Sequence, residues 1–148
     1  MEFKKERYSE QLVCELLSLL QQHHEEVSHC PDVPIEPDFN IYRKMEDMGI
    51  LRIFTARENG EIVGYSVFFV SASIHHKSKL QAAQDLLFLR PDYRRGFTAY
   101  RFIKWCDDQL RADGVKSIFQ YVNVKSDFGS LLERMGYNKF ETLYVRRV

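Results

Sequence analysis

The residues best suited to chemistry lie in one segment, where an apolar strand runs into a basic turn and then a helix. Residues 86–99 read LLFLRPDYRRGFTA. The first turn of a helix offers free backbone N–H groups and a partial positive charge, so Arg94, Arg95 and Arg101 are unfavourable there unless an anion binds. Gly96 removes a side chain where a ligand could approach. We therefore interpret the turn as a phosphate or diphosphate site, formed by Arg94, Arg95, Gly96, Phe97, Thr98 and Ala99.

A second interpretation of this turn needs no ligand. The arginines would be solvated, and Asp92 would neutralise part of their charge. Nucleotide motifs do not decide between the two, because no Gly-Lys-Ser/Thr follows as in a Walker loop. One glycine is also too few for the dinucleotide fingerprint. The residues alone leave both interpretations open.

Hydrophobic periodicity predicts the elements that must position this turn. We expect helices at residues 9–27, 38–49, 98–112 and 127–135, and strands at 50–57, 62–70, 80–89, 115–124 and 140–148. Asn59-Gly60 predicts a tight hairpin, so its two strands are antiparallel. Strand, helix and strand over residues 81–121 imply a parallel pair. The expected fold class is α/β, with a mixed, mostly antiparallel sheet that has helices on both faces.

Composition restricts the function classes. The chain has 148 residues, which predicts a single domain over residues 1–148. Lys plus Arg and Asp plus Glu both number 21, and this neutrality argues against nucleic acid as a partner. No apolar run predicts a membrane span or a signal peptide. The odd set of Cys14, Cys30 and Cys106, without a C-x-x-C pair, favours free thiols and a cytoplasmic location.

The segment around Gly96 closely resembles the acetyl-CoA-binding stretch of the GNAT N-acetyltransferase superfamily. Leu89, Pro91, Tyr93, Arg94 and Gly96 fall on the frame of that stretch. The sequence RENGEIVGY at 57–65 is similar to the family's hairpin, and LLERMGY at 131–137 to its late helix and glycine-aromatic turn. The order of the expected elements agrees over residues 9–148. In detail the pattern is closest to GNAT proteins of phages and prophages, which would place a phage-encoded protein in the host cytoplasm.

The resemblance implies an acetyl-CoA-dependent N-acetyltransferase that uses no metal. Its acceptor would be a primary amine of a small molecule, a lysine or a protein N-terminus. The backbone of Leu87, Phe88 and Leu89 is expected to pair with the pantetheine arm of acetyl-CoA. Gln84 is expected to orient the substrate or a relay water.

Asp85 is the candidate catalytic base. It lies where GNAT enzymes often carry a catalytic Glu or Asp. A carboxylate inside an apolar strand is costly unless it has a partner or a role. A structural Asp near a strand bulge is the alternative. Strand alternation places one set of residues on the same face: Gln81, Ala83, Asp85, Leu87 and Leu89.

The sequence departs from the family pattern in the turn and in the late helix. Tyr93 stands where Gln or Arg is frequent, and Thr98 stands at the second Gly/Ala position. Leu132 occupies the position of the tyrosine that protonates the coenzyme A thiolate, and Lys125 that of a nearby asparagine. Tyr144 and Tyr137 are substitute candidates for the acid, with packing as the alternative role for both.

The end of the first helix carries a cluster of polar residues. It comprises His23, His24, Glu25, Glu26, His29 and Cys30. Their spacing matches no standard zinc frame, so we expect no metal. In GNAT proteins this region lines the acceptor pocket, which makes His24 and Glu25 candidates for binding a cationic amine. A solvated helix end is the alternative.

Two other functions remain open from the sequence. The first is a non-catalytic acyl-CoA-binding or protein-interaction module on the same fold, which Leu132 supports and Asp85 opposes. The second is a small phosphate-binding protein unrelated to coenzyme A. The apolar hairpin and the final strand are also compatible with a homodimer.

Overall fold

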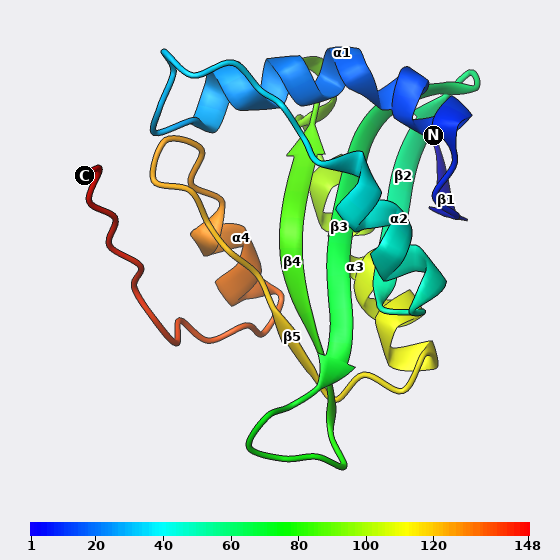
Figure 1. The fold of residues 1–148 in the computed structure, drawn as a ribbon, viewed down its shortest axis with the longest axis vertical. Helices are drawn as coiled ribbons and strands as arrows, with labels where there is room; N and C mark the ends of the chain where they lie inside the picture. The colour runs from blue at the N-terminus through cyan, green and yellow to red at the C-terminus, as the bar shows by residue number, and fades with distance from the viewer.

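The structure, a computed structural model, describes residues 1–148. Its elements follow one another as β1 (Glu2–Glu6), α1 (Glu10–Val27), α2 (Phe39–Asp47), β2 (Leu51–Glu58), β3 (Glu61–Ala72), β4 (Leu80–Leu89), a 3-10 turn (Pro91–Tyr93), α3 (Thr98–Ala112), β5 (Ser117–Phe119) and α4 (Gly129–Arg134). The five strands form one sheet in the order β1-β2-β3-β4-β5 (Figure 1). All neighbours are antiparallel except β4 and β5, which are parallel. The mixed α/β fold class is therefore confirmed.

Local sequence explains why these elements begin and turn where they do. The Ser9 hydroxyl accepts a hydrogen bond from the backbone N–H of Leu12 at 3.1 Å and caps α1. Asn59 and Gly60 both have positive φ, 51° and 87°, as a two-residue hairpin turn between β2 and β3 requires. At Gly64 on β3, an added Cβ would lie 2.7 Å from the Leu89 side chain, so the close contact of β3 with β4 requires glycine.

Two apolar clusters, one on each face of the sheet, hold the helices in place. Behind the sheet in Figure 1, Phe102, Cys106 and Leu110 of α3 pack with Phe54 and Phe68 of the strands. On the other face, four buried leucines of α1 pack against β2, β3 and β4: Leu12, Leu16, Leu19 and Leu20. These packed faces account for the hydrophobic periodicity from which both helices were predicted. No helix is both long and apolar enough to span a bilayer.

Three strand predictions need correction. β1 was not expected, because Phe3 is its one side chain packed against a core cluster and residues 2–6 show no apolar alternation. β5 covers Ser117–Phe119 instead of residues 115–124, since the chain leaves β4 after Phe119. Residues 140–148 form no strand: they pair with no other strand and are exposed throughout.

Candidate functional site

A β-bulge at Asp85 changes the faces of β4 in its middle. Val67 of β3 pairs with Leu86 and Phe68 pairs with Gln84, so Asp85 is the extra residue. Asp85 contacts α2, whereas Leu87 and Leu89 pack with the cluster around α3. The expectation that these three side chains share a face is therefore wrong, because the bulge reverses the alternation after Asp85.

β4 and β5 separate just beyond their short contact. The two strands pair at Gln81–Ala83 and Ser117–Phe119 only. The side chain of Gln84, which is buried, then accepts a hydrogen bond from the N–H of Tyr121 at 3.2 Å. From Asp85 to Leu89, β4 has no strand on this side. Apart from the carbonyl of Leu89, which accepts a hydrogen bond from Nε of Arg94, its backbone edge is free to bind another extended chain.

The turn after β4 presents a row of backbone donors. Gly96 has φ +66°, a conformation that favours glycine, and no atom lies within 4 Å of an added Cβ. The N–H groups from Arg95 to Tyr100 donate no hydrogen bond within the protein, and the first such bond is that of Arg101 to the carbonyl of Phe97. Free N–H donors and the positive end of a helix dipole are the features that favour anion binding.

Arg94 is held by a carboxylate from the end of α1. Its guanidinium donates to both carboxylate oxygens of Glu26, at 2.9 and 2.7 Å, and its Nε donates to the carbonyl of Leu89 at 2.6 Å. The bond from Arg94, together with one from Ser126, lowers the pKa of Glu26. Arg94 is therefore not a free cation, as the sequence suggested, but closes one end of the site.

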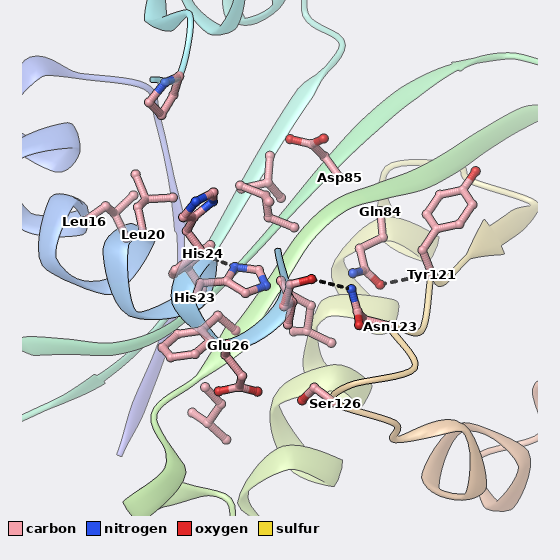
Figure 2. A pocket seen from close by; sticks show the side chains of 18 of the residues that line it. Leu16, Leu20, His23, His24, Glu26, Gln84, Asp85, Tyr121, Asn123 and Ser126 are labelled. Carbon is pink, nitrogen blue, oxygen red and sulfur yellow. Dashed lines mark hydrogen bonds between the residues drawn. The ribbon is translucent and has the colours of Figure 1, made fainter. Parts of the chain in front are cut away.

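A cavity of about 730 Å³ connects these features, and most of its lining residues are hydrophobic. This volume falls within the range of small-molecule sites. Figure 2 shows Asp85 at one end, Glu26 and Ser126 at the other, and His23 between them. The far wall comes from the chain after β5, where the Asn123 side chain donates to the carbonyl of Val27 at 3.1 Å. We call the end near Arg94 the cofactor end and the end near Asp85 the acceptor end.

His23 is a neutral histidine in the middle of the cavity. Its Nδ1 lies 2.7 Å from the hydroxyl of Tyr65, and its ring stacks on Phe88 with centroids 5.1 Å apart. Burial lowers the pKa of His23 from 6.5 to about 4, an effect that Glu26 partly opposes. His23 is consequently uncharged at neutral pH, and its Nε2 has no hydrogen-bond partner.

Asp85 is paired with a tyrosine of α2. The hydroxyl of Tyr42 donates to Oδ2 of Asp85 at 2.6 Å. Burial, with the bond to Asp85, raises the pKa of Tyr42, so this hydroxyl keeps its proton at neutral pH. Asp85 itself is exposed, which corrects the argument that it is buried in an apolar strand. Its place beside the cavity makes it available to a ligand.

The other expected site residues lie partly in the lining of the cavity and partly in the turn that adjoins it. Leu87, Phe88, Leu89, Arg94 and Ala99 line the cavity, while Arg95, Gly96, Phe97 and Thr98 lie in the adjoining turn. Gln84 and His24 also line it, but the Nε2 of His24 lies 2.9 Å from the carbonyl of Val33 and holds the segment between α1 and α2.

Three expected site residues lie outside the cavity. Glu25 is exposed on α1 and accepts a hydrogen bond from Gln21. Tyr144 is 89% exposed in the C-terminal segment and does not line the cavity, although its neighbour Leu143 does. Tyr137 donates to Asp107 of α3 at 2.7 Å, which is a packing role. None of the three is placed to bind substrate or donate a proton in the cavity.

Sequence reasoning missed Tyr42, and from the polar cluster at the end of α1 it selected His24 and Glu25 instead of His23 and Glu26, which have the defined contacts in the site. His23 continues the stripe of Leu12, Leu16 and Leu19 at helical spacing, so that pattern already placed it on the inner face of α1. The partners of Tyr42 and Glu26 are 43 and 68 residues away along the chain, and no local pattern indicates them.

Comparison with known proteins gives matches at the level of structure. No protein-family model matches the sequence, and neither does any curated protein. The ribosomal-protein-alanine N-acetyltransferase of Brucella melitensis biovar Abortus 2308 matches over 100% of both chains, with a TM-score of 0.73 and 16% identity. The chain has an acetyltransferase fold. The GNAT fold expected from the sequence is thereby confirmed.

Two further solved structures have the same fold. An aminoglycoside acetyltransferase from an uncultured soil metagenomic sample, in complex with sisomicin, has a TM-score of 0.69 and 19% identity, covering 99% of this chain and 94% of its own. A predicted acetyltransferase from Clostridium acetobutylicum, solved with acetyl-CoA, has a TM-score of 0.70 and 12% identity, covering 98% and 96%. At such identities the similarity establishes the fold, and function must be argued from the site.

Proposed function

We propose that this protein is an acetyl-CoA-dependent N-acetyltransferase that acetylates a primary amine. The observation that carries the proposal is that one cavity joins the unpaired edge of β4 and the free N–H groups after it to a carboxylate at its other end. Two of the similar structures are acetyltransferases named for amine acceptors, an alanine of a ribosomal protein and aminoglycosides.

Acetyl-CoA fits the cofactor end by its chemistry. The amides of its pantetheine arm can pair with the free edge of β4 between Asp85 and Leu89, as an added strand would. The diphosphate can accept hydrogen bonds from the N–H groups between Arg95 and Tyr100, with the Thr98 hydroxyl adjacent. This pose directs the thioester toward the bulge at Asp85. The neighbour solved with acetyl-CoA supports the choice of cofactor.

The chemistry proposed at the acceptor end is direct transfer. Alkylamines have a pKa of about 10 and are mostly ammonium at neutral pH, so Asp85 first takes one proton from the acceptor. The amine nitrogen then attacks the thioester carbonyl. The new C–N bond forms as the C–S bond breaks, and the sulfur leaves with the bonding electron pair. The nitrogen loses its second proton to water, and the thiolate takes one proton from water to give coenzyme A, while Asp85 later releases its proton to solvent.

A second candidate is a non-catalytic acyl-CoA-binding module. It is favoured by the wall that α4 contributes to the cavity, which consists of Phe128 and Leu131 and offers no proton to the thiolate. Leu132 is 5% exposed and packed away. The two candidates share the cofactor site and differ in whether coenzyme A is released.

Calorimetric titration with acetyl-CoA tests the cofactor site first. We expect micromolar binding that Gly96→Glu abolishes, because the substitution strains the backbone and adds a negative charge beside the phosphates. Gly49→Glu is the matched control, since Gly49 also has positive φ, 72°, and open space around it, but lies at the end of α2. No binding at millimolar acetyl-CoA by the folded protein would refute both candidates. Binding without amine-dependent coenzyme A release would leave the non-catalytic module.

A further inference from the structure

The acceptor end of the cavity has a composition that selects among amines. Its walls come from α1, from the segment that joins α1 to α2, from α2 and from β4. The apolar lining residues of the cavity on these elements include Leu12, Leu16, Ile35, Phe39 and Leu86. Phe39 lies about one helical turn before Tyr42, which bonds Asp85, and Leu86 follows Asp85 on β4. Ile35 and Phe39 are half-buried and pack against the buried cluster under α1, so they form a fixed apolar surface.

Charged groups at this end are few. Asp85 and the exposed Glu36 are the carboxylates there, because Glu26, the remaining one in the cavity, is held by Arg94 at the cofactor end. Of these two, Asp85 is fixed in place, by the hydroxyl of Tyr42. Glu25, which would have added a charge, lies outside the cavity. A ligand with several ammonium groups would therefore lose its hydration without gaining enough carboxylates to pair with them. The unpartnered hydroxyl of Tyr8, which also lines the cavity, is neutral and does not change this charge balance.

We propose that the acceptor is a small primary amine carried on an alkyl or aryl group. Its ammonium pairs with Asp85, and its apolar body lies against Ile35, Phe39 and Leu86. This inference rests on the proposed acetyltransferase function and specifies the substrate class of the same site. Burial of an apolar body drives its binding, so affinity grows with apolar area.

The test is a series of monoamines that carry the same charge and differ in the length of their apolar body. Coenzyme A release is measured with ethylamine, butylamine, hexylamine and phenethylamine, and with 5-amino-1-pentanol, 1,5-diaminopentane and sisomicin for comparison. We expect kcat/KM to rise by about fourfold for each added methylene that is buried. We expect hexylamine to exceed 5-amino-1-pentanol, which has the same length but ends in a hydroxyl.

Variants of the segment between α1 and α2 localise the effect. Ile35→Asn is expected to remove most of the advantage of hexylamine over ethylamine while leaving acetyl-CoA binding unchanged. Val33→Asn is the matched control, because Val33 lies in the same segment, is 46% exposed and does not line the cavity. The melting temperature of each variant shows whether it is folded. The series of amines on the wild type tests the acceptor class even if neither variant folds.

The possible results separate the substrate class from the function. A preference for sisomicin or 1,5-diaminopentane over hexylamine, or equal rates for hexylamine and 5-amino-1-pentanol, overturns the apolar acceptor while acetyl transfer stands. Acetyl-CoA binding with no release for any amine overturns the proposed function and the acceptor class with it. A rise of kcat/KM with chain length that Ile35→Asn reduces supports both the acetyltransferase function and the apolar acceptor.

Discussion

The cofactor end and the acceptor end of the cavity are built from different parts of the chain. The cofactor end uses mainly backbone: the edge of β4 and the N–H groups from Arg95 to Tyr100. The acceptor end uses side chains from three elements, with Asp85 and Tyr42 among apolar residues. Backbone recognition tolerates most side chains and depends on the fold and on glycine at position 96. Side-chain recognition can change the acceptor without changing the fold.

The strongest test of this contrast is Asp85→Asn, which removes the proposed base and leaves the backbone site intact. We expect kcat to fall by about 10²- to 10⁴-fold, the usual contribution of a general base. The dissociation constant for acetyl-CoA should stay within about twofold, because the edge of β4 is unaltered. Steady-state kinetics and calorimetry on the same preparation measure the two quantities.

The control for Asp85→Asn is Asp108→Asn on the exposed face of α3, where the carboxylate pairs with Lys104. It removes the same charge far from the cavity and should leave kcat unchanged. Equal loss in both variants, or no loss in Asp85→Asn, would contradict the role of Asp85.

His23, between the two ends, gives the next largest effect, and it is an effect of pH on stability. Folded His23 stays neutral down to about pH 4, whereas in the unfolded chain it gains a proton below about pH 6.5. The unfolded state therefore binds more protons between these values, and the free energy of unfolding falls as the pH drops through them. A shift of one pKa unit corresponds to ~1.4 kcal/mol, so the free energy of unfolding lost through His23 is about 3 kcal/mol.

The measurement is urea unfolding of the wild type and of His23→Gln at pH 7, 5.5 and 4. The variant cannot gain the proton, so its stability should fall by about 3 kcal/mol less than that of the wild type between pH 7 and pH 4. His76→Gln is the control, because His76 is exposed in the turn between β3 and β4. Parallel pH profiles for wild type and His23→Gln would mean that His23 is not held neutral.

The same contrast explains which parts of the site the sequence could predict. The turn at Gly96 and the strand before it are continuous in sequence, so their residue types indicated an anion site as one of two interpretations. The acceptor end is assembled from segments far apart in the chain. Its pair of Tyr42 with Asp85 follows from packing, as does the pair of Arg94 with Glu26 at the cofactor end.

The elements followed the same rule. The Asn59-Gly60 hairpin and the hydrophobic periodicity of the helices are local signals, and the elements that they indicate were predicted correctly. The bulge at Asp85 and the separation of β5 from β4 depend on neighbouring strands, so they were not predictable from periodicity. Residues 140–148 have strand-like composition but no partner strand, which composition alone does not reveal.

Tyr42→Phe tests whether the acceptor end needs its carboxylate held in place. The variant keeps the ring and removes the hydrogen bond to Asp85, which the exposed carboxylate can replace with water. We expect kcat/KM for the amine to fall by about fivefold, the effect of one such bond, with acetyl-CoA binding unchanged. Tyr144→Phe, in the C-terminal segment outside the cavity, is the control. A loss as large as that of Asp85→Asn would instead make Tyr42 a proton carrier.

Glu26→Gln gives the smallest effect and tests whether the ion pair with Arg94 competes with the cofactor. Neutralising Glu26 frees the Arg94 guanidinium for a phosphate oxygen of acetyl-CoA. The pair is partly exposed, and such pairs contribute no more than about 1 kcal/mol, so the dissociation constant should fall by about threefold. The gain should shrink at high salt, because screening weakens both interactions. Weaker binding in Glu26→Gln would show instead that Glu26 orients Arg94, and the cofactor end would then depend on side chains as the acceptor end does.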